Sequence, residues 1–125
     1  MDNTITLASF LSQEITKDEE VARAAAGWDR SGRERVPGVW TRSGMNSVES
    51  VRGSVVYGDG PAPDDAEAEH IALNDPARVL AECAAKRAIL AMHPMCGSVA
   101  GESCRELRIL AAVYADRPDY NEEWR

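Results

Sequence analysis

Residues 31–58 read SGRERVPGVWTRSGMNSVESVRGSVVYG, and their composition differs from that of the chain on either side. Glycine and proline separate short runs rich in valine, and alanine is absent from residues 27–61. The pieces 39–41 and 54–57 carry β-branched and aromatic residues, which favour strands, and glycines at positions 44 and 53 can supply turns. We therefore predict a small antiparallel sheet of two or three strands within residues 31–58.

Helices are expected on both sides of this sheet. Apolar residues recur at helical spacing through residues 1–27, and Gly27 is placed to end that helix. Residues 64–93 predict a helix pair interrupted at Asp75-Pro76, where Asp75 can cap the second helix and Pro76 fits its first position.

A last helix is expected over residues 102–116, introduced by Ser103 and Glu106 at the spacing of a capping box, and an aromatic tail follows over 117–125. The order of these elements predicts an α+β fold: a long N-terminal helix, the small sheet and three further helices. With 125 residues, the chain suits one domain over residues 1–125.

Composition excludes several classes of function. The formal net charge is −7, which opposes broad binding to nucleic acid or to anionic membranes because both require cationic side chains. The sequence has no apolar run long enough for a membrane span and no basic, signal-like start, so a cytoplasmic location is expected. Three cysteines without an export signal favour thiols or a metal site over a disulfide framework.

One candidate site is a zinc centre formed by His93, Cys96 and Cys104, the only cofactor site that the residues suggest. Imidazole and thiolates are ordinary zinc ligands, and the glycines between Cys96 and Cys104 would let them converge. Water, Glu102 or a second chain could supply the fourth ligand. Two alternatives remain: the cysteines are small apolar residues, or Cys96 and Cys104 form a disulfide outside a reducing compartment.

A second candidate site is a partner-binding surface on the sheet. Arg42 and Arg52, with the aromatic Trp40 and Tyr57, belong to residue types that are enriched at interface hot spots. The alternative is an ordinary solvated face whose arginines pair with the acidic segment 59–75, which carries six acidic residues and no lysine or arginine.

The tail is a third candidate. Tyr114, Tyr120 and Trp124 are three of the seven aromatic residues in the chain, and all lie in its last twelve positions. Disordered tails rarely concentrate aromatic residues in this way. Tyr120 and Trp124 therefore either dock on the body of the protein, which we favour, or are presented to a partner.

Several motifs resemble those of a family of small actinobacterial and actinophage proteins classed as a domain of unknown function. They are His70-Ile71-Ala72, then Asp75-Pro76-Ala77-Arg78-Val79-Leu80, then Ala85-Lys86-Arg87 with Ile89-Leu90, and finally Tyr114-Ala115-Asp116-x-Pro118-Asp119-Tyr120-x-Glu122-Glu123-Trp124. The resemblance implies an actinobacterial or phage origin and an intracellular protein, and it implies no activity. The resemblance further implies that some relatives carry Cys-x-x-Cys-Gly at the position of His93-x-x-Cys96-Gly97 in this chain, whereas others lack it.

The residues suggest no convergent catalytic set, because the paired carboxylates are adjacent in sequence and adjacent helical residues do not face one another. We therefore expect a non-enzymatic protein-interaction module with a protein partner and no membrane or nucleic-acid partner. The sequence leaves open whether the protein forms a homodimer. The alternative is a small zinc-binding protein that uses His93, Cys96 and Cys104.

Overall fold

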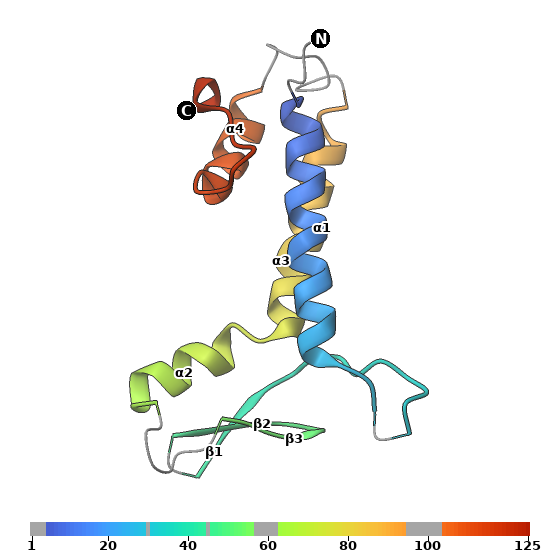
Figure 1. The fold of residues 1–125 in the computed structure, drawn as a ribbon, viewed down its shortest axis with the longest axis vertical. Helices are drawn as coiled ribbons and strands as arrows, with labels where there is room; N and C mark the ends of the chain where they lie inside the picture. The colour runs from blue at the N-terminus through green and yellow to red at the C-terminus, as the bar shows by residue number, and fades with distance from the viewer. Residues whose placement is uncertain (1–4, 30, 45, 57–62, 95–103) are drawn as a thin grey trace. The chain divides into compact units, whose positions relative to one another are not determined.

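The computed structural model describes residues 5–29, 31–44, 46–56, 63–94 and 104–125. Its elements follow the predicted order and confirm the α+β fold (Figure 1). The contacts group the chain into two compact units, and the boundary between them falls within two helices, α1 (Leu7–Ala26) and α3 (Pro76–Ala91). The central unit comprises Glu19–Glu82, and the terminal unit comprises Met1–Asp18 with Cys83–Arg125.

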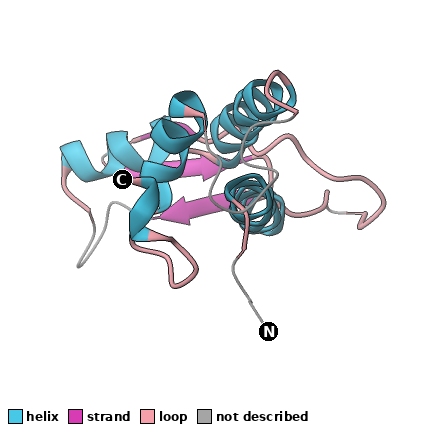
Figure 2. Cartoon of the chain, turned by 90° about the horizontal axis from the view of Figure 1, so that it is seen from above, coloured by secondary structure: helices cyan, strands magenta, loops and turns pink. Residues whose placement is uncertain are grey.

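The sheet of the central unit has three antiparallel strands in the order β1 (Thr41–Ser43), β2 (Ser47–Ser50), β3 (Gly53–Val56). Figure 2 draws the strands in magenta and the helices in cyan. Val48 in the middle strand is fully buried. Helix α2 (Asp65–Leu73) packs on β1 and β2 and buries Ala68. The predicted antiparallel sheet is therefore confirmed, with one face covered by a helix of its own unit.

The bounds of the first strand differ from the prediction, which began it at Val39. The amide of Trp40 donates a hydrogen bond to Asp75 Oδ2 at 3.0 Å, and Gly38 just before it has φ +79°. Because the Trp40 amide is bonded to a side chain, β1 begins only at Thr41. The sequence also gave no separate signal for β2, whose residues are mostly polar.

Two helix ends of the central unit, at Gly27 and at Asp75, follow the local chemistry that the sequence predicts, and the start of α2 adds a capping box that was not predicted. Gly27 has φ +74°, and its amide donates to the Arg23 carbonyl at 2.9 Å, which ends α1. Asp75 Oδ1 accepts from the Arg78 amide at 2.8 Å and caps α3. Helix α2 begins at Asp65 behind an Asp64–Glu67 capping box.

The terminal unit has an apolar core built from the first part of α1, the second part of α3, α4 (Arg105–Ala111) and the C-terminal segment. Its buried side chains are Leu7, Phe10, Leu11, Ile15, Cys83, Leu107, Ala111, Tyr114 and Trp124. Two short 3-10 helices, η1 (Ala112–Tyr114) and η2 (Glu122–Trp124), follow α4. The predicted last helix is thus shorter than residues 102–116.

The predicted capping box at the start of α4 is wrong. Cys104 is the N-cap residue, and its side chain makes no capping hydrogen bond. Glu106 therefore occupies the second helical position instead of the third that a capping box requires. Ser103 lies outside the described residues.

Across the described ranges, we find no helix with the length and apolar character that crossing a bilayer requires.

Candidate functional site

Three potential metal ligands come together in the terminal unit, from two segments on either side of residues 95–103. His93 follows the end of α3, and its amide donates to the Leu90 carbonyl at 3.1 Å. Cys104 is the N-cap of α4, and Glu106 lies in the first turn of that helix. The end of one helix and the start of another therefore present these side chains.

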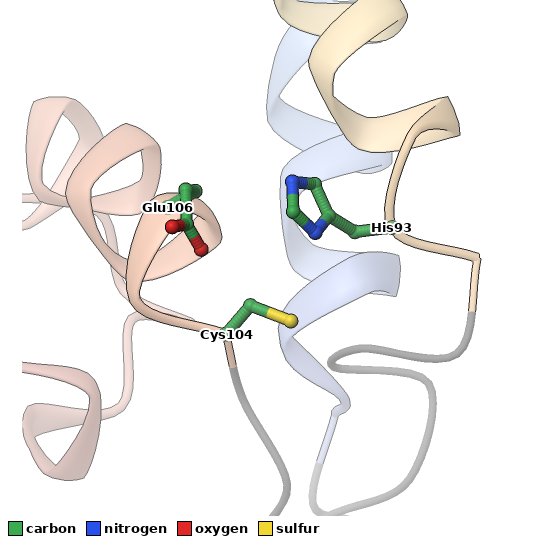
Figure 3. A group of neighbouring side chains, drawn as sticks. All are labelled: His93, Cys104 and Glu106. Carbon is green, nitrogen blue, oxygen red and sulfur yellow. The ribbon is translucent and has the colours of Figure 1, made fainter.

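One ligand atom from each of His93, Cys104 and Glu106 lies within 4.8 Å of the other two. Figure 3 shows the imidazole, the sulfur and the carboxylate gathered between the two segments. His93 and Cys104 are half-buried and Glu106 is exposed. This is a nitrogen, sulfur and oxygen donor set of the kind that zinc accepts.

The state of the cysteines bears directly on this cluster. Cys104 is disulfide-bonded in the structure, whereas Cys83 is a buried cysteine outside any disulfide, and its thiol donates to the Ile15 carbonyl oxygen at 3.9 Å. The predicted ligand Cys96 lies outside the described residues. A sulfur in a disulfide is not a thiolate, so Cys104 can bind a metal only after reduction.

Glu106 is the member of the cluster that the sequence reasoning missed. Its spacing from Ser103 suggested a capping box, and that interpretation gave its carboxylate a structural role. Among the described residues, no hydrogen bond or ion pair engages the Glu106 carboxylate. A usable signal was its position two residues after a predicted ligand, Cys104.

A pocket of about 300 Å³ lies between α4 and the C-terminal segment of the same unit. Its apolar wall is formed by Ile109, Ala112, Ala115, Tyr120 and Trp124. Three arginines line it as well: Arg105, Arg108 and Arg125. The pocket therefore combines aromatic surface with positive charge, although the whole chain is acidic.

Two polar atoms of the pocket residues, Arg108 Nε and the Tyr120 hydroxyl, are buried and have no hydrogen-bond partner among the residues that the structure describes. Arg125 is already engaged, because its Nε donates to Glu122 Oε2 at 2.6 Å. This hydrogen bond lowers the pKa of Glu122 and raises that of Arg125. Within the described ranges, neither Arg105 nor Arg108 takes part in an ion pair, which leaves their charge available to a ligand.

The aromatic tail is docked in its own unit. The ring of Trp124 lies 5.0 Å from that of Phe10 and 5.5 Å from that of Tyr120, measured between centroids. Trp124 is only 7% exposed. Tyr120 and Trp124 thus pack on α1 through Phe10 and at the same time line the pocket.

The other predicted partner-binding residues belong to the central unit and have different surroundings. Arg42 pairs with Asp65 at 2.7 Å and Glu69 at 3.0 Å, so its charge is neutralised by α2. Arg52 donates to the Ala26 carbonyl at 3.4 Å, and Trp40 is half-buried. Tyr57 lies outside the described residues.

A buried polar network completes the terminal unit. Glu14 is 1% exposed and pairs with Lys17 at 2.9 Å and with Arg117 at 3.6 Å. The Tyr114 hydroxyl donates to Asp18 and accepts from Lys86 Nζ. Burial, and then the bond to Asp18, raise the pKa of Tyr114 well above its usual range.

Comparison with known proteins identifies a family and no activity. No curated protein matches the chain, and no solved structure does either. A family model described as "Family of unknown function (DUF6221)" matches residues 4–125. Because this match spans nearly the whole sequence, the chain belongs to the DUF6221 family, whose function is unknown.

Proposed function

We propose that this protein is a non-enzymatic protein-interaction module that acts in the cytoplasm of an actinobacterium or its phage. The observation that carries the proposal is the pocket between α4 and the tail, where arginines flank an aromatic wall. Arginine, tyrosine and tryptophan are the residue types most enriched at interface hot spots. Tyr120 and Trp124 were already candidates from the sequence.

The exposed apolar surface at the pocket supports a protein partner. Ile109 is 62% exposed and lines the pocket together with the Trp124 ring. An apolar side chain from a partner could cover this wall, since a pocket of about 300 Å³ is at the small end of the usual ligand-pocket range. The proposed occupant is therefore an anchoring side chain of a protein.

Charge gives the proposed partner a further property. Arg105 and Arg108 have no ion-pair partner among the described residues, and Arg108 Nε is a buried donor without an acceptor. A carboxylate beside the anchoring side chain would supply that acceptor in a charge-assisted hydrogen bond. We propose an acidic segment that carries an aromatic or aliphatic anchor. The sheet residue Arg42 is a weaker contributor because Asp65 and Glu69 already pair with it.

Site-specific photocrosslinking tests this proposal. A crosslinking amino acid replaces Ile109 in the pocket or, as the matched control, Val113, which is equally exposed at 63% and does not line the pocket. In actinobacterial lysate we expect one discrete partner band from position 109 and none from position 113. R108E should reduce that band by at least about tenfold, a loss typical of a hot-spot residue.

The outcomes of the crosslinking experiment separate the alternatives. Identical bands from positions 109 and 113 would contradict the proposed pocket. A position-109 crosslink to a second copy of this chain would replace the proposed partner by a homodimer.

Zinc binding is the second candidate function, and it is favoured by the proximity of His93, Cys104 and Glu106. Zinc binding is compatible with the interaction function, because the pocket is lined by Arg105, Arg108 and Ile109 of α4 and not by the candidate ligands. Metal analysis of reduced protein purified without chelator tests it. About one zinc per chain is expected, and less than about 0.2 equivalents would refute it.

A further inference from the structure

We propose that Glu106 is a metal ligand beside His93 and Cys104, and that the Cys104 disulfide and the bound metal are mutually exclusive states of this site. The inference rests on the zinc-binding candidate and adds to it a ligand that sequence reasoning had not identified and a condition under which the site can fill. Both additions come from described residues of the terminal unit.

The geometry supports a shared ion. Zinc bonds of roughly 2.0 to 2.3 Å place tetrahedral ligand atoms roughly 3.4 to 3.6 Å apart. The three candidate atoms lie within 4.8 Å of one another, so the largest separation must shrink by roughly 1 Å. Glu106 is exposed, and a change of its side-chain rotamer can deliver such a movement without shifting the helix.

The surroundings of Glu106 also favour a ligand role. Its carboxylate caps no helix and pairs with no cation among the described residues, so binding a metal would break no existing interaction. Glu123, in the same unit, is an exposed glutamate outside the cluster and provides a comparison.

The disulfide makes occupancy dependent on redox state. A dithiol reductant converts the disulfide of Cys104 into two protein thiols and is itself oxidised to a cyclic disulfide, with two electrons and two protons transferred. The Cys104 thiol then releases its proton as its sulfur binds zinc. A small-molecule disulfide reverses the sequence: zinc leaves, the Cys104 thiolate and its partner thiol give up two electrons as their disulfide re-forms, and the oxidant is reduced to two thiols with one proton from the partner thiol and one from solvent.

Metal binding would connect two elements of the terminal unit. His93 is the second residue after α3, and Cys104 immediately precedes α4. A bound ion would therefore tie the end of one helix to the start of the next. Arg105 and Arg108, which line the interaction pocket, follow Cys104 on α4. In reduced, metal-loaded protein the first turn of α4 would therefore be fixed in place, and the positions of these two arginines with it.

The test measures zinc binding to the full chain by competition with a chromogenic chelator, in reduced and in oxidised protein. Reduced wild type should bind one zinc, and oxidised wild type should bind none. E106Q should weaken zinc binding by at least about tenfold, while the matched control E123Q leaves it unchanged. C104S should abolish binding, and circular dichroism checks that each variant is folded.

Cobalt supplies a readout of the ligands themselves. Reduced wild type loaded with Co²⁺ should show a thiolate-to-metal charge-transfer band that C104S lacks and that the buried-cysteine control C83A retains. In E106Q the visible ligand-field bands should shift, because a neutral amide replaces the carboxylate oxygen donor of Glu106.

The outcomes distinguish this inference from the function on which it rests. If reduced E106Q binds zinc as tightly as wild type, Glu106 is not a ligand and the zinc-binding candidate survives. If oxidised protein binds zinc as well as reduced protein does, the two states are not exclusive. If reduced wild type binds no zinc, the inference and the zinc-binding candidate both fail.

Discussion

Tyr114 donates a hydrogen bond from its hydroxyl to Asp18 Oδ2 at 2.7 Å, joining residues 96 positions apart in the sequence. The same hydroxyl accepts a bond from Lys86 Nζ at 3.0 Å. One buried tyrosine therefore connects α1, α3 and η1 inside the terminal unit.

Removing this hydroxyl should destabilise the protein. Y114F leaves Asp18 and Lys86 without their shared partner, and hydrogen bonds to charged groups are worth about 1.5 to 3 kcal/mol. We expect the free energy of unfolding, measured by urea denaturation, to fall by that amount. Y120F is the matched control, because the Tyr120 hydroxyl has no hydrogen-bond partner in the described part of the chain, and it should change stability by less than about 0.5 kcal/mol. Equal losses in both variants would contradict the role of the network.

The same tyrosine predicts a pH dependence. Burial and the bond to Asp18 raise the pKa of Tyr114 in the folded state, whereas an unfolded tyrosine ionises near pH 10. Above about pH 10 the unfolded state therefore binds fewer protons than the folded state, and stability falls as pH rises. The urea midpoint of wild type should drop more steeply than that of Y114F between about pH 9 and 11. Parallel curves would argue against an elevated pKa.

Asp75 should contribute more to the free energy of unfolding than an ordinary helix cap does. Its two carboxylate oxygens accept from the amides of Arg78 and Trp40, and the residue is 9% exposed. D75A loses the cap, worth about 1 kcal/mol, and leaves the Trp40 amide unpaired, at a further cost of about 1 to 3 kcal/mol.

Two variants separate the contributions of Asp75. D64A removes a side-chain cap from α2 without such a long-range bond and should cost only about 1 kcal/mol. D75N can keep one acceptor and should fall between wild type and D75A. Thermal or urea unfolding measures all three, and a D64A loss as large as that of D75A would count against the Trp40 bond.

Gly38 should tolerate alanine less well than Gly32, although both have positive φ, +79° and +71°. A Cβ at Gly38 would lie 2.6 Å from the Pro76 Cβ and 2.9 Å from the Ala26 Cβ, whereas at Gly32 it would meet nothing within 4 Å. G32A should cost about 1 kcal/mol from backbone strain, and G38A a further 1 to 3 kcal/mol, roughly, from overpacking. Urea denaturation compares them, and equal losses would show that backbone strain accounts for both.

Trp124 should anchor the tail. Its 7% exposed side chain packs against Phe10, and replacing a buried tryptophan by alanine typically costs about 3 to 5 kcal/mol. W124A should therefore lower the melting temperature strongly, while V113A, at a site that is 63% exposed, should have little effect. An unchanged melt in W124A would indicate that the tail contributes little to the fold.

The predicted helix ends illustrate how far local sequence reaches. Gly27 ends α1, and Asp75 with Pro76 starts α3, because each signal depends on the backbone within one helical turn. By comparison, the prediction of how α4 starts was wrong. There the N-cap is Cys104 instead of the predicted Ser103, and its side chain makes no capping hydrogen bond.

The candidate sites show the same difference between features that local sequence reveals and features that only the structure reveals. Residue chemistry pointed to His93 and Cys104 as candidate ligands, whereas the proximity of Glu106 to both became visible only in the structure. Tyr120 and Trp124 attracted attention as aromatic residues, whereas the arginines that share their pocket, Arg105 and Arg108, did not. A pocket between a helix and a tail leaves no local signature in the sequence.

Local chemistry was sufficient to specify an α+β chain, the helix boundaries at residues 27 and 75, and a pair of metal-ligand types on either side of a glycine-containing segment. Those features depend on interactions between near neighbours, so they can be read from the order of residues. Tertiary packing set the docking of Trp124 on Phe10, the bond from Tyr114 to Asp18 and the approach of Glu106 to His93. These contacts join residues far apart in the chain or on different helices, and their free energy depends on how the helices bury one another's side chains.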